Sequence, residues 1–201
     1  LSMLALNLKK GDKVLTSPIT FLASANCAEY VGCRTEFCDI NDSTYTIDPE
    51  KIETKLKKDK KIKVIIVVDY AGHPAEWKDL AFLKKKYGVT LINDNCHALG
   101  AKIDNNKYYA IKFADIVTQS FHPVKHITTG EGGAVITNNK DIYEKVKILR
   151  NHGIERNTSI QKNKGLWFYK MNHLGFNYRL SDINCSLGNS QLKSVNKFIK
   201  R

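Results

Sequence analysis

The sequence predicts an α/β domain with a mostly parallel sheet, on the basis of three observations. Short apolar runs rich in β-branched residues alternate with longer segments of helical periodicity along most of the chain. The chain has 201 residues, of which 42% are hydrophobic, so it can bury a sizeable core as one domain. It contains no internal repeat.

The predicted strands are unbroken apolar runs, which are typical of strands buried on both faces. They cover residues 14–16, 35–40, 64–68, 89–92 and 116–118. The predicted helices cover residues 20–31, 49–57, 76–87 and 139–150. The second helix follows Asp48-Pro49, which supplies an N-cap side chain and a proline at the first helical position.

Both ends of the sequence have helical patterns. Residues 1–8 are amphipathic with no cap before them, and residues 181–201 repeat apolar positions at roughly helical spacing. We therefore expect the 201 residues to be a piece of a larger protein. They would form one partial domain, with residues 179–201 as a helix that leads toward a further C-terminal domain.

Composition narrows the class of protein. The formal charge of +12 is compatible with a nucleic acid, an anionic metabolite or a lysine-rich surface. The densest basic run, residues 55–63, has no aromatic residue and resembles a solvated helix end. No nucleic-acid motif is present, but a non-catalytic basic binding module remains the alternative from another class.

The five cysteines are odd in number and include no Cys-x-x-Cys pair, so neither a disulfide framework nor a zinc site is indicated. No apolar stretch approaches the roughly 20 residues needed to span a bilayer. The first residues lack the features of a secretory signal. We expect a cytoplasmic protein with no metal, no membrane contact and no nucleic-acid partner.

Candidate chemistry is concentrated around Lys125, which lies five residues after Ser120 and before a glycine-rich turn. A lysine amine can form a Schiff base, and a serine hydroxyl can help to hold a phosphate, so the pair suggests lysine-bound pyridoxal phosphate (PLP). On spacing alone, a surface lysine beside a turn is the better interpretation. Asp94 and Ser120 each follow a predicted strand, so we expect both at the carboxyl edge of the sheet, where ligands bind.

Six blocks along the chain carry a family resemblance. They are GDKVLTSPITF at 11–21, NDNCHALG at 93–100, SFHPVK at 120–125, TTGEGG at 128–133, RNHG at 150–153 and GFNYR at 175–179. Together they resemble the DegT/StrS nucleotide-sugar aminotransferases, a branch of the fold-type-I PLP enzymes. The resemblance implies the three-layer α/β/α large domain of that fold, with its N-terminal segment and small C-terminal domain missing.

The resemblance also implies roles for individual residues. Lys125 would hold PLP as a Schiff base and move the proton between the substrate carbon and the cofactor. Asp94 would keep the pyridine nitrogen protonated, and His97 would stack on the ring. Ser120 would bind the cofactor phosphate, and Asn177 would reach the phosphate in a partner subunit, which implies a homodimer.

Each of these side chains also has a plain structural interpretation. Asp94 would be a helix N-cap after a strand, and His97 a buried, hydrogen-bonded histidine. Ser120 would be a strand-end turn residue, and Asn177 a loop asparagine with a local turn bond. His122 and Arg150 match recurrent family positions, but the sequence suggests no role for either.

The sequence departs from the family at two positions near the site. Asn93 replaces an acidic residue found in many relatives, and His126 replaces a proline found in close relatives. Neither change removes a catalytic group. Some family members that have histidine in place of the lysine are dehydratases, so Lys125 indicates transamination.

Within the family, VDYAG at 68–72, GLWFY at 165–169 and LGFNYRLSD at 174–182 resemble the UDP-4-keto-6-deoxy-sugar aminotransferases of pseudaminic acid biosynthesis. The resemblance implies transfer of an amino group from L-glutamate to a UDP-4-keto-6-deoxy-N-acetylhexosamine. A different keto sugar nucleotide, dTDP- or UDP-linked, is the alternative substrate. Because the resemblance places a phosphate-binding turn upstream and a closing domain downstream, we expect the 201 residues alone to be inactive or strongly impaired.

Overall fold

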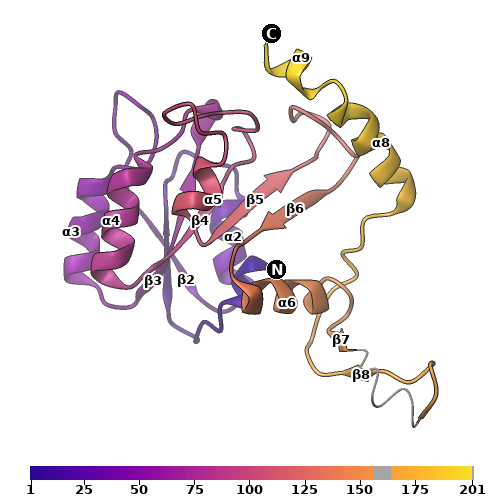
Figure 1. The fold of residues 1–201 in the computed structure, drawn as a ribbon. Coiled ribbons are helices and arrows are strands. Elements are labelled where there is room, and N and C mark those ends of the chain that lie inside the picture. The colour runs from indigo at the N-terminus through magenta and orange to yellow at the C-terminus, as the bar shows by residue number, and fades with distance from the viewer. Residues whose placement is uncertain (156–163, 201) are drawn as a thin grey trace.

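The computed structural model describes residues 1–155 and 164–200. Its main sheet has the strand order β2-β1-β3-β4-β5-β6, in which β1 to β5 are parallel and β6 is antiparallel to β5 (Figure 1). The strands are β1 Lys13–Thr16, β2 Arg34–Phe37, β3 Ile62–Val68, β4 Thr90–Asp94, β5 Ile116–Ser120 and β6 Gly133–Ile136. The predicted α/β fold with a mostly parallel sheet is confirmed.

Alternation along the strands divides the core into two layers. Val64 and Ile66 of β3 are buried with α1 (Ser2–Ala5), α2 (Ala23–Glu29) and α6 (Lys140–Leu149). Ile65 and Val67 point to the other face, where α3 (Pro49–Lys58), α4 (Trp77–Tyr87) and α5 (Tyr109–Phe113) pack. Since successive side chains of a strand point to opposite faces, this apolar run covers both sides of the sheet. The three-layer arrangement is the expected one.

The two ends of the chain differ from the predictions. The predicted N-terminal helix over residues 1–8 ends at Ala5. The predicted helix over 181–201 is wrong as a single element, because it breaks at Lys193 and Ser194 into α8 (Asp182–Leu192) and α9 (Val195–Ile199). Residue 201 lies outside the described residues.

Several short elements were not predicted. Besides α5 and β6, they are η1 Tyr70–Gly72, β7 Ile154–Glu155 and β8 Lys170–Met171. Each is too short to leave a periodic pattern in the sequence. The strand predicted at 35–40 ends earlier, at Phe37, and the helix predicted at 20–31 is α2 alone.

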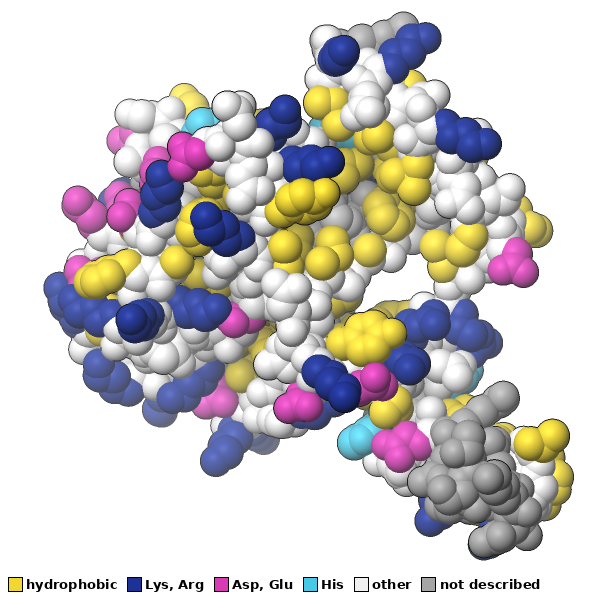
Figure 2. All heavy atoms as spheres, in the orientation of Figure 1, with side chains coloured by type: hydrophobic (Ala, Val, Ile, Leu, Met, Phe, Trp, Pro, Cys, Tyr) yellow, Lys and Arg dark blue, Asp and Glu magenta, His cyan; other side chains and the backbone are white. Residues whose placement is uncertain are grey.

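The basic run, residues 55–63, lies near the start of β3, whereas Asp94 lies at the carboxyl end of the neighbouring strand β4. Residues 55–58 form the last turn of α3, where cations interact favourably with the helix dipole, and β3 begins soon after at Ile62. Figure 2 shows basic side chains gathered on the side of α3 and α4. The interpretation of this run as a solvated helix end is confirmed. None of the helices in the described ranges is long and apolar enough to cross a membrane.

Candidate functional site

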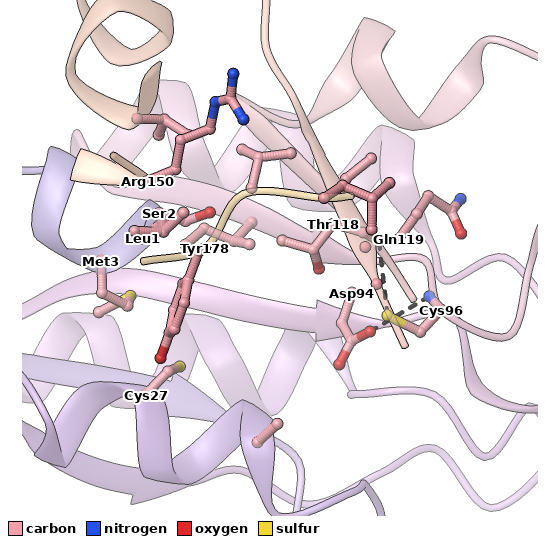
Figure 3. Close-up of a pocket in the computed structure, with 18 of the residues that line it drawn as sticks. Leu1, Ser2, Met3, Cys27, Asp94, Cys96, Thr118, Gln119, Arg150 and Tyr178 are labelled. Atoms are coloured by element: carbon pink, nitrogen blue, oxygen red, sulfur yellow. Dashed lines mark hydrogen bonds between the residues drawn. The ribbon is translucent and has the colours of Figure 1, made fainter. Parts of the chain in front are cut away.

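A cavity of about 1120 Å³ opens at the carboxyl ends of the central strands. Its lining comes from α1, α2, α6 and α8, from β3, β4 and β5, from the start of β6 with the two residues before it, and from residues 177–180. In Figure 3, Asp94 and Cys96 lie on one side of this cavity, and Arg150 and Tyr178 lie on the other. The cavity therefore gathers side chains from distant parts of the sequence.

Asp94 is the last residue of β4 and lies opposite Thr118 on the parallel neighbour β5. Its Oδ2 accepts a hydrogen bond of 2.8 Å from the Ser24 hydroxyl of α2. Its Oδ1 accepts a longer bond of 3.3 Å from the Cys96 backbone N–H. Within residues 1–155 and 164–200, none of the ion pairs includes Asp94. The cavity thus contains a carboxylate with hydrogen bonds but without a paired cation.

The pKa values of two thiols, Cys96 and Cys27, are affected by burial and by the Asp94 charge. Burial raises the pKa of the Cys96 thiol to about 12, with a further contribution from the Asp94 carboxylate. Burial raises the pKa of the Cys27 thiol to about 11, and Asp94 again adds to the shift. Both thiols are therefore neutral near pH 7.

The structure brings some of the predicted residues to this cavity and places others beside it. Asp94, Asn177 and Arg150 line the cavity. Ser120 and His97 do not, but each directly follows a lining residue in the sequence. The expectation that Asp94 and Ser120 share one edge is confirmed, because they end neighbouring parallel strands.

Lys125 lies in the loop that joins β5 to the antiparallel strand β6, and its side chain is partly exposed. Lys125 is absent from the cavity lining. Its positive charge nevertheless affects the pKa values of Cys96 and His97, which follow Asp94 in the sequence. Burial lowers the pKa of His97, and the Lys125 ammonium lowers it further. The same ammonium opposes the rise in the Cys96 pKa. Lys125 and Asp94 therefore shift the pKa values of the same two side chains, Cys96 and His97, in opposite directions.

The other predicted residues make local contacts. Ser120 Oγ accepts a bond of 3.3 Å from the His122 backbone N–H, which is the turn interaction considered for this serine. The His97 and Tyr70 rings are tilted, with centroids 6.3 Å apart. Asn177 is exposed in this structure. The roles predicted for Ser120, His97 and Asn177 toward a ligand stay predictions.

A buried polar cluster behind Asp94 was missed by the sequence analysis. Its centre is Asp69, which is fully buried directly after β3 and whose backbone N–H donates to the Asp94 carbonyl. The Asp69 carboxylate accepts bonds from five groups. They are the Ala75 N–H and Trp77 Nε1 on Oδ1, and Asn93 Nδ2, Asn95 Nδ2 and the Tyr109 hydroxyl on Oδ2.

This cluster fixes both neighbours of Asp94 in the sequence. The Asn93 and Asn95 amides both donate to Asp69, at 3.0 and 2.8 Å. Asn95 Oδ1 in turn accepts a bond from Gln119, the residue before Ser120. All five donors therefore converge on one buried carboxylate. Burial, and then the Asp69 charge, raise the pKa of the Tyr109 phenol.

The cluster explains the unusual Asn93. An acidic side chain at this position would bring a second carboxylate to the buried Asp69, whereas the amide donates a hydrogen bond to it. Asn93 Oδ1 is left without a hydrogen-bond partner among the described residues. A polar residue directly after the apolar strand at 64–68 was the available signal for Asp69.

Two of the sequence blocks lock together beside the cavity. The Phe176 N–H donates to the Leu149 carbonyl, and the Tyr178 N–H donates to the Arg150 carbonyl. A Cβ on Gly175 would lie 2.3 Å from the Gly153 nitrogen. The RNHG and GFNYR blocks therefore form one backbone unit, which holds Asn177 and Arg150 at the cavity.

Gly153→Ala is expected to destabilise this unit, because the added Cβ would lie 1.7 Å from the His173 carbonyl oxygen. Gly32→Ala is the matched control, since both glycines have positive φ, +69° and +74°, but a Cβ on Gly32 meets no atom within 4 Å. Gly32→Ala should cost about 1–2 kcal/mol of unfolding free energy from backbone strain alone. Gly153→Ala should cost about 1–3 kcal/mol more through overpacking. Urea unfolding measures both, and equal losses would contradict the backbone lock.

A sequence profile of the DegT/DnrJ/EryC1/StrS aminotransferase family matches residues 1–201. The chain belongs to this family. The family predicted from the six sequence blocks is thus confirmed. The family match also accounts for the order of these blocks along the chain, which spacing alone did not explain.

Known family members that the chain resembles are about twice as long. A Campylobacter jejuni protein, UDP-4-amino-4,6-dideoxy-N-acetyl-beta-L-altrosamine transaminase, is 46% identical over 190 residues, which are 94% of this chain and 48% of that protein. The structure of Helicobacter pylori PseC, an aminotransferase involved in the biosynthesis of pseudoaminic acid, has a TM-score of 0.85 at 32% identity over 98% of this chain and 51% of that chain. The chain spans about half the length of these relatives.

A third relative was solved with its cofactor named. The PLP form of a putative sugar aminotransferase from Streptococcus pneumoniae has a TM-score of 0.82 at 26% identity. The match covers 98% of this chain and 53% of that chain. The shared fold therefore extends over almost all of the present chain.

The candidate site residues of the present chain fit a PLP-type group better than a metal ion. The described part of the chain contains no group of three His, Cys, Asp or Glu side chains that could hold a metal ion. An unpaired carboxylate beside a large cavity can accept a hydrogen bond from a cationic N–H, and a lysine acts on the same turn. The arrangement is suited to a nitrogen heterocycle with an aldehyde group.

Proposed function

We propose that the whole protein is a PLP-dependent aminotransferase that acts on a keto sugar nucleotide. The observation that supports this most is the Asp94 carboxylate, which faces a 1120 Å³ cavity without an ion pair among the described residues, while Lys125 acts on the adjacent turn. PLP, when bound, supplies a ring that takes up the electrons left when the substrate C–H bond breaks.

In this proposal each residue has a separate task. Lys125 attaches the cofactor through its Nζ and later moves the proton at the substrate carbon. Asp94 keeps the pyridine nitrogen protonated, and His97 covers the ring. Ser120 binds the cofactor phosphate through its hydroxyl, which can still donate a hydrogen bond while it accepts one from His122.

We further propose a UDP-4-keto-6-deoxy-N-acetylhexosamine as amino acceptor and L-glutamate as donor. The 46% identity to the Campylobacter jejuni transaminase supports this substrate class. We also propose a homodimer in which Asn177 serves the partner's site. The exposure of Asn177 on the rim of the cavity is consistent with that role.

The test is product analysis with the whole protein, PLP, L-glutamate and a panel of UDP- and dTDP-linked 3-keto and 4-keto sugars. We expect an amino sugar only with the UDP-4-keto substrate, and 2-oxoglutarate in equal amount. Ping-pong kinetics should follow, because the nitrogen is stored on the enzyme between the two half-reactions. Amination of a dTDP-linked or 3-keto sugar would correct the substrate, and no amination of any of them would contradict the function.

A further inference from the structure

Ser24 lies in α2, three residues after the first sequence block, and its hydroxyl reaches Asp94 at the end of β4. Ser24 is only 3% exposed, and its Oγ donates to Asp94 Oδ2 over 2.8 Å. A second hydroxyl, Thr20 Oγ1, lies 2.8 Å from Ser24 Oγ. Thr20 and Ser24, four residues apart in the sequence, therefore form a chain of hydrogen bonds that ends on the distant Asp94.

The direction of this hydrogen-bond chain follows from the chemistry of its last member. An ionised carboxylate can only accept, so Ser24 has to give its single proton to Asp94. The bond between the two hydroxyls then has to run from Thr20 to Ser24. Hydrogen bonds that run in one direction polarise one another, so Thr20 strengthens the bond that Ser24 makes to Asp94.

Two hydrogen bonds hold the Asp94 carboxylate, one on each oxygen. The Ser24 bond to Oδ2, at 2.8 Å, is shorter than the 3.3 Å bond that the Cys96 backbone N–H donates to Oδ1. None of the ion pairs of the described residues includes Asp94. A short hydrogen bond to a carboxylate oxygen fixes its direction, so the Ser24 hydroxyl orients Asp94.

We propose that Ser24, supported by Thr20, is a positioning residue that orients the Asp94 carboxylate for the pyridine nitrogen of the cofactor. The proposal rests on the proposed function, and it concerns two hydroxyls to which the sequence analysis gave no role: Ser24 of α2, outside the six sequence blocks, and Thr20, in the first of them. Without the Ser24 bond, Asp94 would no longer be held in this orientation. A carboxylate hydrogen-bonded to the pyridine nitrogen would favour its protonated form, so loss of the orientation would lower the protonated share of that nitrogen.

The test compares Ser24→Ala with wild type in the whole protein loaded with PLP. We expect the dissociation constant of PLP to rise at least about tenfold, which corresponds to loss of one hydrogen bond to a charged group. We also expect the nitrogen-15 resonance of labelled PLP to move from the protonated toward the unprotonated position. Thr20→Val should shift both quantities in the same direction but less, and it provides the test if Ser24→Ala does not fold.

Thr35→Val is the matched control, because the Thr35 hydroxyl donates to the Ala25 carbonyl of the same helix at 3.0 Å without touching Asp94. It should leave both readouts at wild-type values. Wild-type values in Ser24→Ala and Thr20→Val, in a wild-type protein that binds PLP, would overturn the role of Ser24 and leave the proposed function intact. Failure of the wild-type protein to bind PLP would overturn the proposed function itself.

Discussion

Replacing Lys125 with alanine in the whole protein is expected to lower the rate of amino transfer by about four orders of magnitude. Two tasks are lost together in this proposal, attachment of the cofactor and movement of the proton at the substrate carbon. Single-turnover formation of the amino sugar measures the loss. The stability of the fold should not change, because the partly exposed Lys125 makes none of the ion pairs found among the described residues.

Two further variants separate the possible causes. Lys125→Arg keeps the positive charge beside Cys96 and His97 but cannot form the covalent bond, so it should be as inactive as Lys125→Ala. Lys140→Ala, at the exposed first residue of α6, should keep wild-type activity. If Lys125→Arg retained activity within tenfold of wild type, Lys125 would act only through its charge.

Replacing Asp69 with alanine is expected to cost about 3–5 kcal/mol of unfolding free energy, because each buried donor that loses its acceptor costs about 1–3 kcal/mol. The substitution removes the acceptor that five buried donors share, including the Trp77 indole N–H and the Tyr109 hydroxyl. Urea unfolding followed by circular dichroism measures the loss. A second consequence should be weaker PLP binding, because Asn93 and Asn95 on either side of Asp94 lose their common partner.

Glu144→Ala is the surface control for this experiment. The Glu144 side chain is 47% exposed and pairs with Lys147 at 3.5 Å along α6. Exposed pairs of this kind contribute about 0–1 kcal/mol. Equal losses for Asp69→Ala and Glu144→Ala would mean that the buried cluster does not stabilise the fold.

The central strands and the edge position of the site could be predicted from the sequence. The run at 64–68 is β-branched and bounded by polar residues, so it predicted β3 and its burial on both faces. Asp94 and Ser120 could be placed on one edge because parallel strands end together. These predictions depended only on local pattern and on general rules of sheet topology.

The contacts made across the fold could not be predicted. Nothing in the spacing of Thr20 and Ser24 indicates that their hydroxyls lead to Asp94, which lies 70 residues further along the chain from Ser24. The break between α8 and α9 also has no signal in the apolar spacing, which continues across Lys193 and Ser194. Long-range hydrogen bonds and helix breaks of this kind depend on tertiary packing, which cannot be inferred from the apolar periodicity of a single segment.

The most direct test of the central claim is the position of the covalent bond to PLP. The whole protein is loaded with PLP, reduced with borohydride, digested and mapped by mass spectrometry. We expect a single modified lysine, Lys125, and no adduct in Lys125→Ala. An adduct on any other lysine of the wild-type protein, or an undiminished adduct in Lys125→Ala, would contradict the account.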